Sequence, residues 1–254
     1  MSRYLITGSA SGIGAALRQR LLSLQHQVIG VDLRDADIEV DLSTASGREQ
    51  GVAQALARCA GSIDGLVCCA GLGPAADPAA IVSVNYFGAL AFMDGMFTAL
   101  QGGNQPAAVV VSSTGAVQMD AAQHTLNEAL RAGDEGTART IAAQAQTPLL
   151  AYCITKYAIT CAMRERAMPW GQAGVRLNAV APGPIQTPLL QAFVEDKRYP
   201  AQTSGFLPPL GRRGQPEEVA QFIHYLLSPE AAFIHGSLMF IDGGIDALVR
   251  PHTF

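Results

Sequence analysis

Short apolar runs alternate along the chain with longer stretches in which apolar residues recur at helical spacing. The apolar runs predict buried strands at RYLIT (3–7), QVIGVD (27–32), IDGLVCCAG (63–71), PAAVVVSS (106–113) and GVRLNAVAPG (174–183). Helical spacing follows the first run in ALRQRLLSL and recurs at about 46–60, 79–100 and 150–171. Strands that are apolar throughout indicate a parallel sheet covered on both faces. The pattern therefore predicts an α/β fold, a single doubly wound, Rossmann-type domain over 1–254 with a central parallel sheet flanked by helices on both faces.

Two segments interrupt this alternation. Residues 118–149 lie between a predicted strand and a predicted helix, and their pattern predicts two short amphipathic helices with a turn at AGDEG. Residues 184–212 follow a Pro-Gly stop and are rich in proline and glycine. Long segments after the carboxyl ends of strands often form lids and substrate loops. We therefore predict an inserted helical segment at 118–149 and a substrate lid at 184–212.

Composition and charge exclude several classes of function. The chain has 254 residues, a net charge of −4 and no basic stripe, so nucleic acid is not an expected partner. No segment approaches about 20 uninterrupted apolar residues, so no membrane span is expected. The five cysteines are odd in number, lie in apolar runs and lack zinc-ligand spacing. They indicate reduced cysteines in a cytoplasmic protein without a metal site.

A glycine-rich stretch, 7-TGSASGIG-14, lies between the first predicted strand and the first predicted helix. Gly8 permits a tight turn, Gly12 lets the backbone approach a pyrophosphate, and Gly14 allows close helix–strand packing. Asp32 stands at the end of the next strand, eighteen positions after Gly14. An acid in that place accepts hydrogen bonds from the adenosine ribose and repels a 2′-phosphate. The pattern therefore indicates NAD (NADH), although nearby Arg34 leaves the strictness of that preference open.

A second pattern carries proton-transfer chemistry. Tyr152 and Lys156 are four residues apart on a predicted helix and share one face, and Lys156 is one of only two lysines in the chain. A free phenol has a pKa of about 10 and is a poor base, but a nearby ammonium favours its ionised form. Ser113 ends a predicted strand at the same sheet edge, where its hydroxyl could orient a substrate carbonyl.

Together these elements resemble the short-chain dehydrogenase/reductase family over nearly the whole chain. The motifs that carry the resemblance are TGSASGIG, Asp32, 41-DL-42, 69-CAG-71, Asn85 in 84-VNYFG-88, Ser113, Tyr152-x-x-x-Lys156, 182-PG-183 with Thr187, and 242-DGG-244. The resemblance implies that Tyr152 exchanges a proton and Ser113 positions the reacting oxygen. It implies that Lys156 holds the nicotinamide ribose and that Asn85 anchors a proton-relaying water. It assigns the cofactor to Gly8, Ser11, Gly12, Ile13, Gly14, Asp32, Leu33, Asp41, Leu42, Ala70, Gly71, Tyr152, Lys156, Gly183, Ile185 and Thr187.

The chain departs from the family pattern at several places. Cys69 stands where the family usually has asparagine, and only thirteen residues separate Gly71 from Asn85. The segment 118–149 is longer than usual, and helices there would block one of the family's subunit contacts. We therefore expect a homodimer.

Longer stretches resemble members of the family that act on steroids, among them 31-VDLRDADIEVDLSTASGR-48 and 242-DGGIDALVRPHTF-254. This implies reversible, NAD-dependent oxidation of a 3α-hydroxyl of a steroid to the ketone. The apolar runs 189-LLQAFV-194 and 206-FLPPL-210 favour such a rigid apolar substrate. Two alternatives stay open: a dehydrogenase of another secondary alcohol or ketone, and a nucleotide-binding module without catalysis.

Overall fold

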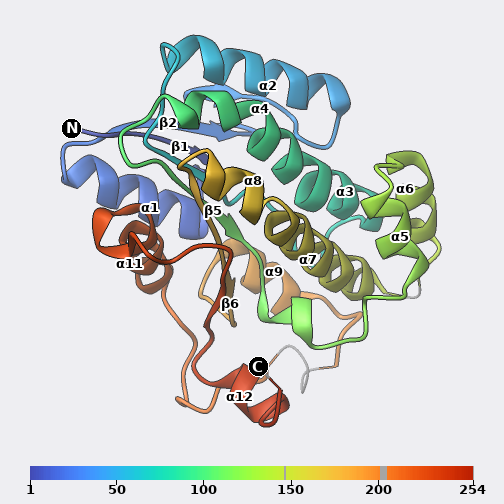
Figure 1. The fold of residues 1–254 in the computed structure, drawn as a ribbon. Coiled ribbons are helices and arrows are strands. Elements are labelled where there is room, and N and C mark those ends of the chain that lie inside the picture. Colours follow the sequence, from blue (N-terminus) through green and yellow to red (C-terminus); the bar gives the residue numbers. More distant parts are fainter. Residues whose placement is uncertain (146, 201–204, 254) are drawn as a thin grey trace.

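A single parallel sheet forms the centre of the molecule. The computed structural model describes residues 1–145, 147–200 and 205–253, and within these ranges seven strands pair in the order β3-β2-β1-β4-β5-β6-β7 (Figure 1). The strands are β1 (Arg3–Thr7), β2 (Gln27–Asp32), β3 (Ile38–Glu39), β4 (Gly65–Cys68), β5 (Ala107–Val111), β6 (Arg176–Pro182) and β7 (Leu238–Ile241). All neighbouring pairs are parallel. The predicted fold class is confirmed.

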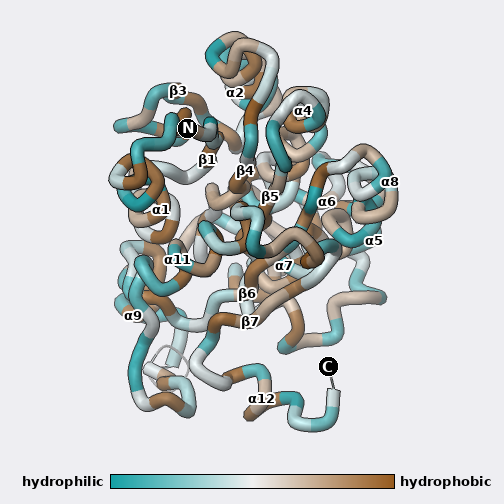
Figure 2. Tube along the Cα trace, turned by 60° about the vertical axis from the view of Figure 1, so that its left-hand side comes forward, coloured by the Kyte–Doolittle hydropathy of each residue, from teal (hydrophilic) through white to brown (hydrophobic). Residues whose placement is uncertain are grey.

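Helices cover both faces of the sheet, which explains why the strands are largely apolar and do not alternate with polar residues. One face carries α1 (Gly12–Ser23) and α11 (Pro216–Leu227), and the other carries α2 (Ala45–Arg58), α4 (Ala89–Gln101) and α7 (Pro148–Glu165) (Figure 1). Successive residues of β5 belong alternately to the two cores: Val109 packs toward α11, and Val110 packs toward α4. Figure 2 shows the hydrophobic colour following the central strands between these helices.

One long apolar helix crosses the second face. It comprises α3 (Pro78–Val82), a π-helical turn at Ser83–Gly88, and α4, and it begins where the Asp77 carboxylate accepts a hydrogen bond from the Ala80 N–H. The helix was predicted at 79–100, but the π-helical turn was not. By length and composition Pro78–Gln101 is apolar enough to span a membrane, yet 56% of its most apolar window is buried inside the protein. This burial fits a core helix.

The helix predicted at 150–171 is interrupted near its end. α7 ends at Glu165, and a short helix, α8 (Ala167–Gln172), follows. Pro169 explains the break, because its ring lacks an N–H and would collide with the carbonyl four residues earlier in a continuous helix. Trp170 is buried and packs on Phe97, with ring centroids 4.8 Å apart, as expected of a packing residue.

Two short helices, α5 (Thr125–Arg131) and α6 (Glu135–Ala143), occupy the described part of 118–149; residue 146 lies outside it. They pack on α3 and α7 of the same chain, at the right of Figure 1. The buried guanidinium of Arg48 on α2 forms an ion pair with the Glu135 carboxylate. Arg139 on α6 donates to the hydroxyl of Ser83, the first residue of the π-helical turn, at 2.6 Å. The segment is thus joined to the part of the core that carries Asn85.

Short helices also close the carboxyl edge of the sheet. These are α9 (Pro188–Glu195), after β6, and α12 (Ile245–Val249), after β7. Two 3₁₀ turns lie elsewhere in the chain order, one after β5 at Thr114–Val117 and one before β7 at Pro229–Ala231. The predicted lid, 184–212, is described except for residues 201–204. Figure 1 shows α9 and α12 at the same end of the molecule.

Candidate active site

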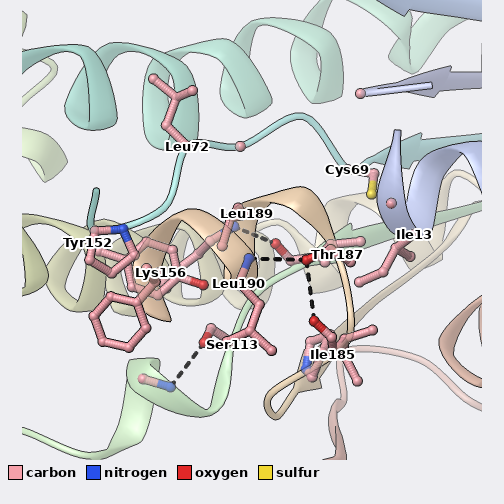
Figure 3. Close-up of a pocket in the computed structure, with 18 of the residues that line it drawn as sticks. Ile13, Cys69, Leu72, Ser113, Tyr152, Lys156, Ile185, Thr187, Leu189 and Leu190 are labelled. Carbon is pink, nitrogen blue, oxygen red and sulfur yellow. Dashed lines mark hydrogen bonds between the residues drawn. The ribbon is translucent and has the colours of Figure 1, made fainter. Parts of the chain in front are cut away.

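A cleft of about 850 Å³ lies at the carboxyl ends of the strands (Figure 3). The chain runs outward from β1 to one side of the sheet and from β4 to the other, and such a reversal leaves a crevice between the two strand ends. The predicted residues on its wall are Gly8, Ser11, Gly12, Ile13, Asp32, Leu33, Asp41, Leu42, Ala70, Gly71, Ser113, Tyr152, Lys156, Gly183, Ile185 and Thr187. Two predicted residues, Gly14 and Asn85, lie behind the wall.

The glycine-rich turn has the geometry that a pyrophosphate requires. Gly8 and Gly12 have φ values of +72° and +52°, in the left-handed region that favours glycine. A Cβ on Gly8 would lie 2.6 Å from the Ala70 nitrogen, and one on Gly14 would lie 1.9 Å from the Gly8 oxygen. The hydroxyl of Ser11, the N-cap of α1, makes no capping bond. The first turn of α1 therefore presents N–H groups and a hydroxyl to the cleft, as a phosphate-binding turn does.

Asp32 lies at the end of β2 with both carboxylate oxygens held in place. Oδ2 accepts from the Ala10 N–H at 2.9 Å, and Oδ1 accepts from the Leu33 N–H at 2.7 Å. Each oxygen retains a lone pair, so the carboxylate can also accept from two ribose hydroxyls. The residues present therefore fit a nicotinamide dinucleotide whose ribose lacks a 2′-phosphate.

Thr7 supports the turn that contains Cys69. The Thr7 hydroxyl accepts from the N–H groups of Cys69 and Ala70, at 3.2 and 3.1 Å. This turn thus keeps its backbone position although Cys69 replaces the usual asparagine. Burial raises the pKa of the Cys69 thiol to about 11, and the positive charge of Lys156 opposes that rise. The side chain is therefore a neutral thiol near neutral pH.

Tyr152 and Lys156 lie side by side on α7, facing the end of β5 (Figure 3). The Lys156 ammonium donates to the Val111 carbonyl at 2.8 Å and lies 5.9 Å from the centre of the Tyr152 ring. The Ser113 hydroxyl oxygen accepts from the Gly115 N–H at 3.1 Å, which leaves its own proton for a second partner. The hydroxyl of Ser112, one residue earlier, interacts with Thr160 at 2.7 Å and ties β5 to α7.

Burial, rather than the charge of a neighbour, is the largest influence on the pKa values of Tyr152 and Lys156. Burial raises the pKa of Tyr152 to about 12, and a hydrogen bond from Ser113 opposes the rise. Burial also lowers the pKa of Lys156 to about 8. The sequence predicted a lowered tyrosine pKa because of the lysine, and in the protein alone the direction is the opposite. The buried phenol therefore holds its proton at neutral pH.

Asn85 is 1% exposed and lies in the π-helical turn. Its side-chain oxygen accepts from the Leu72 N–H at 2.7 Å, and its amide nitrogen donates to the Leu72 carbonyl at 2.9 Å. A Cβ on Gly71 would lie 3.4 Å from the Asn85 oxygen and 3.5 Å from the Lys156 nitrogen. Gly71 therefore lies between these two groups and keeps the space between them open.

The half of the cleft beyond Ser113 and Tyr152 is apolar. Its wall includes Leu72, Pro74, Leu149, Cys153, Leu189, Leu190, Phe193, Phe206, Ile245 and Val249. Sequence analysis identified Leu189, Leu190 and Phe193 of α9, and Phe206, as apolar loop residues but did not assign the others to the substrate site. Leu149 comes from the start of α7, and Val249 comes from α12, so only the folded chain brings them together. Among the described residues, no group of three or more histidine, cysteine or carboxylate side chains is arranged to hold a metal ion.

Comparison with known proteins identifies the family. A profile described as short chain dehydrogenase matches residues 3–148, and one described as enoyl-(acyl carrier protein) reductase matches 144–246. The chain is 50% identical, over 100% of both lengths, to a 3-alpha-hydroxysteroid dehydrogenase/carbonyl reductase of Comamonas testosteroni. It is 30% identical, over 96% of both, to a coniferyl-alcohol dehydrogenase of a Pseudomonas species. It is also similar to the crystal structure of a 3-alpha-hydroxysteroid dehydrogenase of Pseudomonas sp. B-0831 with NADH, with a TM-score of 0.97, 53% identity and full coverage of both chains.

Proposed function

The chain belongs to the short-chain dehydrogenase/reductase family, and we propose that it catalyses the reversible, NAD-dependent oxidation of a 3α-hydroxyl of steroids to the 3-ketone. The observation that carries this proposal is that one cleft combines a half suited to a nucleotide with a half suited to an apolar substrate. Asp32 and the glycine-rich turn suit an NAD nucleotide, while Ser113 and Tyr152 border an apolar chamber. The full-length similarity to two 3-alpha-hydroxysteroid dehydrogenases supports it.

Each of the four predicted catalytic residues has a proposed role in this reaction. Bound NAD supplies the hydride acceptor in one direction and NADH the donor in the other. The Ser113 hydroxyl, which donates to the Tyr152 phenol in the protein alone, turns to the substrate and orients the reacting oxygen. Tyr152 gives or takes the proton at that oxygen, and its raised pKa suits donation to a ketone. Lys156 holds the nicotinamide ribose, and Asn85, behind the wall, keeps Leu72 and a relay water in place.

The apolar chamber favours a rigid, uncharged substrate over the other alcohols. Lys156 is the single basic side chain on the described wall of the cleft, and it lies at the cofactor side. A sugar would leave most of its hydroxyls without partners against Leu189, Leu190 and Phe193, and an unpaired buried hydroxyl costs about 1 to 3 kcal/mol. A steroid instead buries apolar surface there. We expect the same site to reduce non-steroid ketones that are small enough to enter.

Formation of reduced nicotinamide tests this function. Incubating the protein with NAD and an uncharged 3α-hydroxysteroid should increase the absorbance of NADH, and adding the 3-ketone should reverse the increase. Tyr152→Phe is the matched control, since it keeps the ring packing and removes the exchangeable proton. It should lose roughly 10²- to 10⁴-fold in turnover while NADH still binds. Wild-type turnover of a simple cyclic alcohol but of no steroid would refute the steroid assignment, and loss of less than tenfold in Tyr152→Phe would remove Tyr152 from proton transfer.

We also propose that the protein is a cytoplasmic homodimer. In this proposal α5 and α6 occupy the face of α7 through which related chains associate, which leaves one two-fold contact instead of two. Their packing on α3 and α7 supports this. All five cysteines are free thiols, as expected in a reducing compartment. Sedimentation equilibrium decides the oligomeric state, and a mass of four chains would contradict the dimer.

A further inference from the structure

The roof of the apolar chamber is formed by a helix that buries little of its own surface. Leu189, Leu190 and Phe193 of α9 line the chamber, yet no residue of this helix is buried. Within 186–200, all of which the structure describes, Tyr199 is the only buried residue, with 8% exposed. The position of the roof therefore depends on what holds Tyr199.

Tyr199 contacts three separate parts of the chain. Its hydroxyl donates to the Pro74 carbonyl at 3.0 Å, and its ring packs on Phe193, with centroids 4.7 Å apart. The N–H of Leu149, in the first turn of α7, faces the phenol oxygen. Burial raises the pKa of Tyr199, and the hydrogen bond from this N–H opposes that rise. A single side chain thus joins the roof to the 72–76 loop and to the helix that carries Tyr152.

The same loop receives two more contacts from the roof. The Arg198 guanidinium donates to the Ala75 carbonyl at 2.8 Å. The same guanidinium also donates, through Nε, to the Asp196 carboxylate at 2.9 Å. The Leu189 side chain packs directly on Gly73: a Cβ added to Gly73 would lie 2.6 Å from the Cδ2 of Leu189. α9 is therefore fastened to the 72–76 loop at both ends.

On its other side, the 72–76 loop is fastened to the catalytic centre. The Asn85 amide makes two hydrogen bonds to the backbone of Leu72, at 2.7 and 2.9 Å. The loop thus connects the roof of the chamber with the π-helical turn beneath it.

We propose that Tyr199 is a positioning residue that holds α9 over a large apolar substrate by anchoring it to the 72–76 loop and to the start of α7. The inference rests on the proposed function and deepens it, because it names the side chain on which affinity for a steroid-sized substrate depends. A small cyclic alcohol needs only the space beside Ser113 and Tyr152, so its binding should not depend on this anchor.

Substitution of Tyr199 by phenylalanine tests the anchor. Tyr199→Phe keeps the ring contact with Phe193 and leaves the buried Pro74 carbonyl without its donor. The KM for an uncharged 3α-hydroxysteroid should rise roughly tenfold, while kcat and the KM for cyclohexanol change by less than about threefold. Tyr225→Phe is the matched control, because Tyr225 is exposed on α11, away from the cleft.

Hydrogen exchange tests the anchor without any substrate. In ligand-free Tyr199→Phe, the amides of 189–199 should exchange at least about tenfold faster than in the wild type, while those of the central strands stay unchanged. If the wild type oxidised no steroid, the proposed function would fail, but this measurement would still report on the anchor. Unchanged exchange with an unchanged steroid KM would overturn the proposal, and so would an equal rise of KM in Tyr225→Phe.

Discussion

Lys156 shows how a residue with a proposed role in catalysis can reduce the stability of the fold that carries it. The side chain is 6% exposed, and burial lowers its pKa from 10.5 to about 8. Each pKa unit corresponds to about 1.4 kcal/mol, so holding the charged amine in the core at neutral pH costs about 3 kcal/mol. The hydrogen bond to the Val111 carbonyl offsets part of this cost.

We therefore expect Lys156→Met to be inactive but more stable. At pH 7 the variant should gain about 1 to 3 kcal/mol in the free energy of unfolding, while NADH affinity and turnover fall together. In the wild type the unfolded chain binds the proton more tightly, so stability should rise as the pH increases from about 8 to 10.5. The variant should lack that rise. Urea unfolding of both ligand-free proteins at several pH values checks this, and a less stable Lys156→Met would contradict it.

Asp32 should set the choice between NAD and NADP. Its carboxylate is fixed by the Ala10 and Leu33 N–H groups and would face a 2′-phosphate at close range, which costs several kcal/mol. We expect kcat/KM to favour NAD by at least about 100-fold, and Asp32→Ala to narrow the ratio to below about tenfold. Asp35→Asn, which removes a nearby exposed charge, should leave the ratio unchanged. Equal kcat/KM for both cofactors in the wild type would mean that Arg34 dominates.

At the scale of elements, the strands were predictable where both of their faces are buried. β1, β4 and β5 are continuous apolar runs, and the sequence located them to within a few residues. β3 has only two residues and gives no comparable signal. β7, at the edge of the sheet, is the apolar run LMFI, and sequence analysis did not identify it although its pattern is as apolar as that of β4. The π-helical turn was also missed, because the apolar pattern of the helix is the same on either side of it.

The site also has one half that could be predicted from the sequence and one half that could not. The cofactor half consists of short motifs at strand ends, and these can be recognised from spacing. Asn85 was also identified from its motif, but its hydrogen bonds to Leu72 depend on a loop thirteen residues away. The apolar half takes Leu149, Phe193 and Val249 from three helices, and tertiary structure alone brings these together.

The helices α5 and α6 allow a test of how much a buried ion pair stabilises an element. The side chain of Arg48 is 8% exposed where it pairs with Glu135 of α6, and it also donates to the Leu42 carbonyl. Glu135→Gln removes the compensating charge and should lower the free energy of unfolding by about 2 to 4 kcal/mol. Glu165→Gln is the control, because its pair with Arg131 is more than half exposed and should contribute at most about 1 kcal/mol. Urea unfolding measures both, and equal losses would show that burial of the pair is unimportant.

At the scale of the whole molecule, a histidine cluster joins three elements on the face of the sheet that carries α1 and α11. His224 of α11 accepts from the Arg20 Nε–H of α1 at 3.3 Å, and His26, before β2, accepts from the Ser2 N–H at 3.2 Å. The two imidazole rings are 6.3 Å apart. The His224 ring acts as an acceptor through Nδ1, so it carries no proton at that nitrogen.

This cluster should make the whole fold sensitive to mild acid. Burial, then Arg20 and His26, lower the pKa of His224 below its ordinary 6.5, and Glu230 only partly opposes them. The unfolded chain therefore binds the proton first, so the stabilising contribution is intact above about pH 6.5 and is lost as the pH falls. The loss is at most about 1.4 kcal/mol per pH unit for this one group. His224→Asn keeps an acceptor for Arg20 but cannot titrate, so its unfolding midpoint in urea should fall less than that of the wild type between pH 7.5 and about 5. His252→Asn, at an exposed position near the end of the chain, should follow the wild type, and parallel curves for His224→Asn and the wild type would show that the cluster does not control acid stability.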